Sequence, residues 1–292
     1  MNTKTLTRTI LGALILMSLC VGGYLLYDRG RPAPIPMKQK LYEGVMYRRV
    51  VRYFPHPMIA HALTIDTKEN GIEFLVTPPD SESETPLKAR TTSQFLEEFN
   101  LQIAINGGGF SPWWSRSPAD YYPHVGDPIA PAGFTASNGK VYWTISNTEG
   151  TPPALFISRR NALSFNNKPN RVHSAISGDR MLVLKGEIVP DLEGSDVEPR
   201  TAVGINRNGR YVYFVVVDGR QPFYSEGATF TELAQLLIEQ GAYIAMSLDG
   251  GGSSTMVIEG EDGRPRILNS PIDHYIPGTE RPVGTHLGIY IK

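Results

Sequence analysis

The stretch TFTELAQLLIEQGAYIAMSLDGGGSST, residues 229–255, decides the fold, because it sets a helix, a strand and a glycine-rich turn in direct succession. Thr229 stands three residues before Glu232, the spacing of an N-terminal capping box, and Gly241 is suited to end the helix. Apolar residues recur at helical spacing between them, so one face of the helix is expected to pack on a sheet. The segment YIAMSL then predicts a strand that leads to Asp249.

A second apolar run, RYVYFVVV at 210–217, predicts a strand just before this helix. The order strand 210–217, helix 229–240, strand 243–248 is that of a βαβ unit, whose two strands run parallel as neighbours or nearly so. Both strands then end at one edge of the sheet, where adjacent strands lie about 4.8 Å apart. We therefore expect Asp218 and Asp249, which follow these strands, to lie side by side.

A third strand, LQIAI at 101–105, ends in Asn106 and three glycines, which repeats the pattern of a polar residue before glycine. Glycine at a strand end lets a ligand approach the backbone closely, and such ends form the ligand crevices of open α/β sheets. A single Asp-Gly or Asn-Gly pair is a common turn signal. Three of them at comparable strand ends predict one shared ligand site.

Strand patterns dominate the chain after residue 41. Further strands are predicted at 60–66, 71–77, 140–145, 154–157, 181–184, 201–206, 255–258 and 285–291. A second helix is predicted over Thr92–Asn100, with Thr92 and Ser93 as cap-forming residues. The pattern predicts an α/β, or mixed α+β, fold in which residues 41–292 form a single domain with a curved mixed β-sheet flanked by helices.

The N-terminal segment is typical of a membrane anchor. Ile10–Tyr27 is an apolar run without a charged residue, it follows Lys4 and Arg8, and as a helix it would extend about 27 Å, close to the thickness of a bilayer core. We interpret residues 1–28 as an uncleaved signal anchor and transmembrane helix, with the remainder outside the cytoplasm. Residues 29–40, rich in proline and basic residues, are interpreted as a linker.

Composition and missing motifs narrow the function. The net charge of −1, with scattered basic residues, argues against a nucleic-acid-binding protein. The glycine-rich stretch has no P-loop lysine, no dinucleotide motif fits, and the GxSxG elbow of serine hydrolases is missing. The six histidines have no zinc-ligand spacing, so we expect no metal-ligand set and no required cofactor. The sequence does not indicate a divalent cation but is compatible with one.

Several motifs occur together and in order: INGGGF (105–110), SGDRMLVLKGEIV (177–189), PRTAVGIN (199–206), VVDGR (216–220), SLDGGGSSTMV (247–257) and ERPVGTHLGIYI (280–291). This set resembles the phosphodiester glycosidase family, uncovering-enzyme-like proteins with bacterial members linked to exopolysaccharide, from about Gly44 onward. The resemblance implies hydrolysis of a sugar 1-phosphodiester, which releases the sugar from a phosphate-bearing partner on cell-envelope or extracellular glycans.

The chemistry of this reaction suggests roles for the strand-end residues. Glycoside cleavage passes through an oxocarbenium-like state, which a carboxylate stabilises by attack or by activating water, and Asp249 and Asp218 are suited to these parts. A phosphate leaving group calls for arginine, so Arg200 and Arg220 are candidates to bind it through bidentate hydrogen bonds. Additional donors are expected from Gly107, Gly250, Gly251, Ser253, Ser254 and Thr255.

The family resemblance adds candidates that spacing alone does not support. It makes Glu280 a rival acid or base and Arg281 a further anion ligand, while Asn106 could orient a sugar hydroxyl or bind a cation. The loop aromatics could stack on a pyranose or pack a lid onto its own domain: Trp113, Trp114, Tyr121 and Tyr122.

Alternative readings remain. Arg200 could be a surface ion pair with Glu198. The protein could be a non-catalytic glycan-binding or exopolysaccharide-assembly protein, or a metal-dependent phosphodiesterase that cuts the P–O bond.

Overall fold

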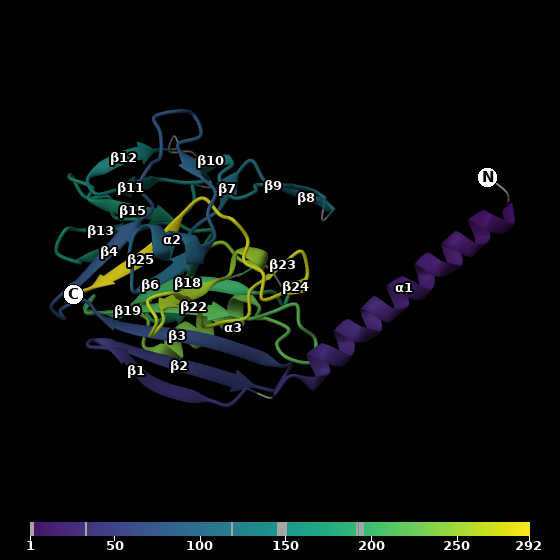
Figure 1. Ribbon diagram of the computed structural model, residues 1–292. Helices are drawn as coiled ribbons and strands as arrows, with labels where there is room; N and C mark the ends of the chain where they lie inside the picture. Colours follow the sequence, from purple (N-terminus) through teal and green to yellow (C-terminus); the bar gives the residue numbers. More distant parts are fainter. Residues whose placement is uncertain (1–2, 33, 118, 145–150, 191, 193–195) are drawn as a thin grey trace.

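The computed structural model describes residues 3–32, 34–117, 119–144, 151–190, 192 and 196–292 (Figure 1). Several residues of the predicted segments lie outside the described residues: Met1 and Asn2 of the anchor, Ala33 of the linker, Pro118 of the aromatic loop and Ile145 at the end of the predicted strand 140–145.

The largest sheet has eight strands, and every neighbouring pair in it runs antiparallel. Their order is β1 (Met37–Tyr42), β2 (Val45–Arg52), β3 (Met58–Asp66), β19 (Tyr211–Val217), β18 (Arg200–Ile205), β20 (Ile244–Ser247), β16 (Met181–Leu184) and β17 (Glu187–Ile188). The central strands place apolar side chains on both faces of the sheet, because other parts of the domain cover both faces.

A second sheet packs on one face of the first. Its five strands have the order β22 (Pro265–Ile267), β21 (Met256–Glu259), β6 (Ile103–Asn106), β25 (His286–Ile291) and β4 (Ile72–Val76). Side chains from the facing sides of the two sheets, among them Phe214, Ile105 and Leu287, form the largest cluster of buried apolar residues. The two sheets therefore form a sandwich around one core.

Two helices cover the outer faces of this sandwich. Helix α3 (Phe230–Gln240) packs on the eight-stranded sheet, and helix α2 (Thr92–Glu98) packs on the five-stranded sheet. The predicted capping box of α3 is confirmed, because Thr229 and Glu232 exchange hydrogen bonds and Gly241 closes the helix in the left-handed region. For α2 the predicted cap was displaced by one residue, since Thr91 is the N-cap.

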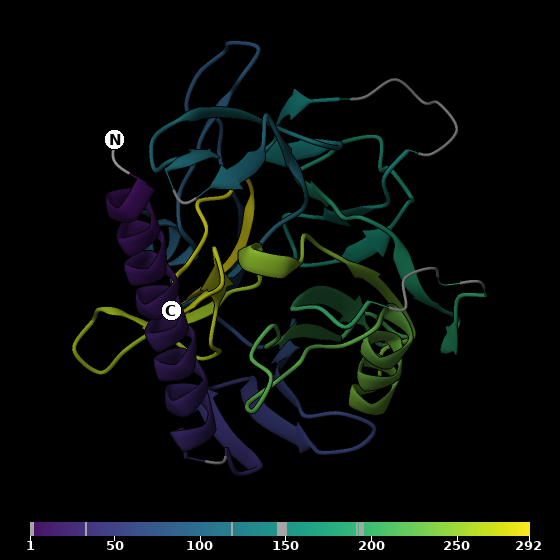
Figure 2. The same cartoon turned by 90° about the vertical axis from the view of Figure 1, so that its right-hand side faces the viewer.

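The remaining strands form small sheets at the rim of the sandwich (Figures 1 and 2). A further five-stranded sheet contains β12 (Lys140–Trp143), β11 (Thr135–Ser137), β15 (Ser174–Ser177), β13 (Ala154–Ile157) and β14 (Leu163–Phe165). A three-stranded sheet contains β5 (Leu87–Lys88), β10 (Pro128–Pro131) and β7 (Phe110–Ser111). Two ribbons pair β8 (Trp114–Ser117) with β9 (Asp120–Tyr122) and β23 (Ile272–Asp273) with β24 (Ile276–Pro277).

The predicted fold class is confirmed as a sheet-dominated domain with flanking helices and a preceding N-terminal helix. The sheet structure is divided into several sheets instead of one. The strands β19 and β20 of the predicted βαβ unit do run in the same direction, but β18 lies between them and is antiparallel to both. The two strands are thus parallel and nearly neighbouring, as expected, but one strand separates them, so Asp218 and Asp249 do not follow adjacent strands as the side-by-side placement required.

Helix α1 (Thr3–Gly30) projects away from the domain (Figure 1). Its segment Thr5–Gly30 is long and apolar enough to cross a membrane, and an 18-residue window within it has a mean hydropathy of 2.1. The helix continues two residues beyond the predicted boundary, and strand pairing begins at Met37, within the predicted linker. The segment between α1 and β1 is thus shorter than the linker 29–40 predicted from the sequence.

Candidate active site

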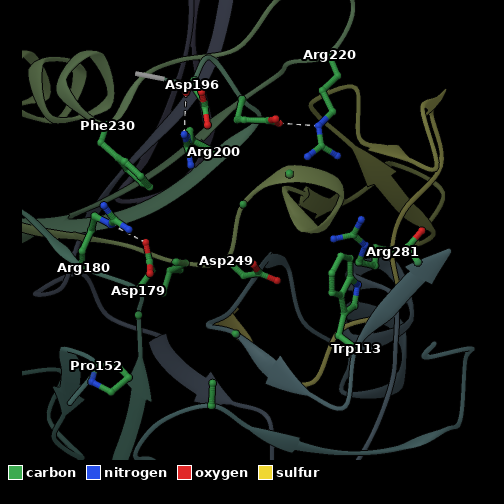
Figure 3. A pocket seen from close by; sticks show the side chains of 18 of the residues that line it. Trp113, Pro152, Asp179, Arg180, Asp196, Arg200, Arg220, Phe230, Asp249 and Arg281 are labelled. Carbon is green, nitrogen blue, oxygen red and sulfur yellow. Dashed lines mark hydrogen bonds and ion pairs between the residues drawn. The ribbon is translucent and has the colours of Figure 1, made fainter. Parts of the chain in front are cut away.

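A pocket of about 870 Å³ lies where four neighbouring strands of the large sheet end or begin together (Figure 3). In sheet order, Arg220 follows β19, Arg200 begins β18, Asp249 lies two residues beyond β20, and Arg180 precedes β16. The loop before β25 adds Arg281. Antiparallel neighbours alternate direction, so strand starts and strand ends meet at this edge.

Asp249 lies in the middle of the pocket, between the arginines (Figure 3). Its backbone is fixed from the second sheet, because the Asn106 side-chain amide donates to the Asp249 carbonyl (2.7 Å) and the Asp249 N–H donates to the Gly107 carbonyl (2.9 Å). Its carboxylate accepts a hydrogen bond from the Ser253 hydroxyl (2.7 Å). Burial raises the pKa of Asp249, although the Ser253 hydrogen bond and the nearby Arg281 charge oppose the rise.

Three of the pocket arginines are held by acidic side chains. Arg220 Nε donates to Glu198 (2.6 Å), Arg281 to the buried Asp273 (2.8 Å), and Arg180 Nε to Asp179 (2.8 Å). Each carboxylate fixes one edge of a planar guanidinium, which orients the remaining donors. The pocket therefore presents cations from several elements in defined orientations.

Arg200 is positioned differently. Its guanidinium donates to the backbone carbonyls of Ala228 (3.1 Å) and Asp196 (2.9 Å), and it lies 3.9 Å from the ring centroid of Phe230. Neutral carbonyls and an aromatic face thus hold the guanidinium, while the charges of Glu198, Asp179 and Asp196 act on it without a direct ion pair. Burial lowers the pKa of Arg200 because the charged form is poorly solvated there, which favours binding of an anion. The alternative reading as an ion pair with Glu198 does not describe the structure, since Glu198 pairs with Arg220.

The glycines after Asp249 allow the arginines to approach. Gly251 has a φ of +59°, which suits glycine, and its N–H donates to the carbonyl of Pro199 (2.8 Å). A Cβ on Gly252 would lie 2.5 Å from Arg281 and 2.7 Å from Asp273, so a larger residue there would displace this ion pair. Of the predicted donors, Gly250 and Gly251 line the pocket.

Arg220 itself has a φ of +58°, in the left-handed region. For a residue with a Cβ this conformation costs about 1 to 2 kcal/mol. Such strain is typically retained where a side chain is needed in a particular place.

Asp218 is not part of the pocket lining. Its side chain is buried, and its carboxylate hydrogen-bonds the ring of His61 (3.0 Å) and accepts from the backbone N–H of Ser270 (2.6 Å) and the Asn269 amide (3.2 Å). His61 in turn contacts the Tyr47 hydroxyl (2.8 Å). The structure thus does not bring Asp218 together with Asp249, and its oxygens are occupied by interior donors.

Asn106 is also fully buried, beneath Asp249. Its amide oxygen accepts from the Thr201 hydroxyl (2.7 Å) and the Thr255 N–H (3.1 Å), while its nitrogen donates to the Asp249 carbonyl. These bonds join β6 to Thr201 in β18, to Asp249 after β20 and to Thr255 just before β21, so Asn106 connects the two sheets. Gly107 is likewise buried, with its N–H donating to the carbonyl of Thr285 (2.7 Å).

The other predicted site residues lie beside or away from the pocket. Ser253, Ser254 and Thr255 are buried, and only Ser253 has a hydrogen bond to Asp249. Glu280 accepts from the N–H of Ser93 (3.0 Å) in the first turn of α2, and burial raises its pKa. It lies outside the pocket lining.

The aromatic residues of the loop differ in position: one lines the pocket, and the others pack within the domain. Trp113 lines the pocket, with Arg281 at 5.3 Å from its ring. Trp114 stacks on Tyr122 at 4.7 Å, and Tyr121 packs against His124 at 4.3 Å, as expected of a loop that packs on its own domain.

Sequence reasoning missed several lining residues. Asp179, Arg180, Phe230, His274 and Tyr275 all contribute to the pocket. The first two follow Gly178 at the end of β15, within a motif that carried the family resemblance. In this motif glycine precedes the acid, whereas the strand ends that indicated a site have an acid or amide followed by glycine. Within the residues that the structure describes, no group of three or more His, Cys, Asp and Glu side chains is arranged as a metal site.

Two sequence comparisons with known proteins point to the same glycosidase family. The sequence profile of the phosphodiester glycosidase family matches residues 99–290. A stretch of 78 residues is 37% identical to N-acetylglucosamine-1-phosphodiester alpha-N-acetylglucosaminidase of Bos taurus and 36% identical to that of Homo sapiens. The matched stretch covers 27% of this chain but only 13% and 14% of those proteins.

Solved structures show the same fold. The catalytic domain of the zebrafish N-acetylglucosamine-1-phosphodiester alpha-N-acetylglucosaminidase, auto-inhibited by its pro-peptide, superposes with a TM-score of 0.59 and 20% identity over 90% of this chain and 86% of that one. A protein from Synechocystis gives 0.59 and 14% over 89% and 64%, and a protein described as exported from Burkholderia pseudomallei gives 0.56 and 16% over 80% and 74%.

The profile match covers more than half of the 292 residues, and it includes the segments that deliver Asp249, Arg200 and Arg220 to the pocket. The chain therefore belongs to the phosphodiester glycosidase family, a family of hydrolases, as its motifs predicted.

Proposed function

We propose that the protein hydrolyses a sugar 1-phosphodiester by cleaving the bond between the anomeric carbon and the phosphate oxygen. The observation that carries this proposal is a partly buried carboxylate, Asp249, surrounded by four arginines in one pocket. A carboxylate at the anomeric carbon and cations at the phosphate are the two groups that this bond cleavage requires.

In this mechanism Asp249 acts at the anomeric carbon, C1. Water supplies its oxygen to C1, the C1–O bond breaks, and the bonding electrons remain on the phosphate oxygen, which leaves as part of a phosphate monoester. Asp249 stabilises the positive charge that develops on the sugar, either by attack or by taking the proton of water. Asp179 also lines the pocket, and its negative charge contributes to the raised pKa of Asp249, so it is the second carboxylate of the proposed site.

Arg200 is the principal phosphate ligand in this proposal, with Arg220 and Arg281 as its partners. Its hydrogen-bond acceptors in the protein are neutral carbonyls, so no carboxylate of the described residues is bound directly to the guanidinium in place of the phosphate. The growing negative charge on the leaving phosphate is then stabilised more strongly than the diester, which accelerates bond cleavage. Asp218 and Glu280 have no part in this scheme, since neither lines the pocket.

The sugar is proposed to be N-acetylglucosamine, because the similar bovine and human proteins are named for that substrate. We further propose that α1 is a retained signal anchor and that the domain acts outside the cytoplasm on cell-envelope or extracellular glycans. The apolar length of α1 and the resemblance to a protein described as exported support this location.

The test is hydrolysis of a synthetic methyl diester of N-acetylglucosamine 1-phosphate in water enriched in oxygen-18. The label is expected in the released sugar, and Asp249→Asn is expected to abolish the release. Label in the phosphate would instead indicate P–O cleavage and a phosphodiesterase. Binding of the diester without turnover by the wild-type protein would indicate a glycan-binding protein.

A further inference from the structure

Helix α1 is attached to the domain at the loop that carries Arg220 into the pocket. The Asp28 carboxylate is buried and accepts a hydrogen bond from the N–H of Phe223 (2.9 Å). Arg31 hydrogen-bonds Gln221 and Ser270, and its guanidinium lies 3.4 Å from the ring centroid of Tyr224. These contacts fix the end of the helix against the turn 221–225.

The attachment sets the height of this turn relative to a bilayer. Asp28 directly follows Tyr27, the last residue of the apolar run, and each helical residue adds about 1.5 Å along the axis. The turn that binds Asp28 therefore lies at the level where the apolar run ends. If α1 spans a membrane, Phe223 lies at the interface between lipid and water.

Large apolar side chains are exposed around this attachment. Phe223 is 55% exposed, Tyr275 70%, Ile276 55% and Phe54 88%. Tyr275 is adjacent to the pocket arginines, since Arg220 lies 5.5 Å from its ring. The loop of Phe54 is connected to the same region through the bond from the Glu226 N–H to the Pro57 carbonyl (2.8 Å). Aromatic residues exposed together are typical of surfaces that contact membrane interfaces.

The pocket lies on the same side of the domain. Figure 1 shows that α1 leaves the domain on the side of β8, β9, β23 and β24, and Figure 2 views the molecule from that side, with α1 along the left of the domain. Trp113, next to β8, and His274 and Tyr275, between β23 and β24, line the pocket. The backbone of His274 and Tyr275 is left-handed (φ of +49° and +60°), a turn that leaves the Tyr275 ring in solvent.

We infer that the pocket mouth lies at the surface of the bilayer and that the substrates are lipid-linked sugar 1-phosphodiesters, in which the alcohol beyond the phosphate is a membrane lipid. This inference rests on the proposed function and on α1 as a retained anchor. The apolar residues of the attachment region enter the interface, the sugar 1-phosphate group enters the pocket, and the lipid chain stays in the bilayer. Hydrolysis then releases the sugar into water and leaves a phosphorylated lipid in the membrane.

The activity test uses the full chain in phospholipid vesicles and two probes, the farnesyl and the methyl diesters of N-acetylglucosamine 1-phosphate. The double variant Phe223→Ser/Ile276→Ser changes two exposed residues outside the pocket lining. It is expected to lose at least about tenfold in kcat/KM on the farnesyl diester and less than about twofold on the methyl diester. The matched control Val141→Ser/Leu184→Ser, at two other exposed apolar residues, should leave both rates unchanged. Equal losses on both diesters, or no loss on the farnesyl diester, would overturn the inference.

A second measurement does not depend on turnover. In a Cys20→Ser background, which removes the single native cysteine, Phe223→Cys and Val141→Cys are each labelled with a fluorophore. Nitroxide-bearing lipids should quench the label at position 223 strongly and the label at position 141 weakly. Equal quenching would overturn the membrane placement. If neither diester is hydrolysed, the proposed function and the lipid-linked substrate both fail, and quenching still decides whether this face contacts the bilayer.

Discussion

Asp218 and Asp249 share one sequence context, since each follows a buried strand of the large sheet and precedes glycine, but their environments differ. Asp249 lines the pocket and has one side-chain donor, the Ser253 hydroxyl. Asp218 lies in the interior, where a histidine ring, a backbone N–H and an amide occupy its oxygens. A strand end brings a carboxylate to the edge of a sheet, and the donors around it decide whether the carboxylate stabilises the fold or serves a ligand.

The largest effect on activity is expected for Asp249→Asn. We expect a loss of about 10³-fold in kcat/KM, because the amide cannot take a proton or form a covalent bond at the anomeric carbon. The thermal midpoint should be unchanged or higher, since desolvation disfavours the charged carboxylate. Steady-state kinetics with a sugar 1-phosphodiester and a melting curve test both parts. An active Asn variant would remove Asp249 from the mechanism.

The opposite pattern is expected of Asp218→Asn. Breaking its buried contacts with His61 and Ser270 should lower the free energy of unfolding by about 3 kcal/mol, since an amide cannot accept from all of these donors. The folded fraction should keep kcat/KM within about threefold of the wild type. Denaturant titration and active-fraction kinetics check this, and a stable but inactive variant would contradict the assignment of Asp218 to the fold.

Arg200→Gln tests the role of a second pocket residue, the proposed phosphate ligand. Loss of the guanidinium should weaken binding of the phosphate group and lower kcat/KM by about 30-fold, as expected from roughly 2 kcal/mol for a charged hydrogen-bonding partner. Inhibition by the phosphate monoester product should weaken in parallel. Arg200→Lys is the matched control, because it keeps the charge but loses the planar donor pair, and it should restore only part of the activity.

The smallest effect is expected for Ser253→Ala. The Ser253 hydroxyl stabilises the ionised Asp249, so its removal should raise the pKa of Asp249 further. If the ionised carboxylate is the active form, the acid limb of kcat/KM moves to higher pH, and activity on that limb falls by about threefold while the plateau above it is kept. A pH profile of kcat/KM measures this. A limb that stays in place would show that another group controls it.

Local signals made much of the fold predictable. The ends of α3 follow from Thr229, Glu232 and Gly241, which act within one turn of the helix. The proximity of Asn106 and Asp249 was also foreseen from their shared position after apolar strands, and a hydrogen bond joins them. In these cases the sequence carries the information within a few residues of the feature.

Contacts between distant segments were not predictable in this way. The insertion of β18 between β19 and β20 depends on pairing across the whole sheet, which no local pattern encodes. The interior position of Asp218 depends on His61, 157 residues away in the chain. Likewise, Glu280 lies outside the pocket lining and accepts a hydrogen bond from the N–H of Ser93 in α2, 187 residues away in the chain.

The position of β25 within the five-stranded sheet has a consequence for how the protein matures. This strand pairs with β6 on one side and β4 on the other, so these two earlier strands lack a pairing partner between them until β25 is made. A ribosome must therefore deliver His286–Ile291 before the sheet that supports Asn106, and through it the Asp249 backbone, can close. Until then the backbone support of Asp249 is incomplete, so the pocket forms only after the sheet has closed around β25.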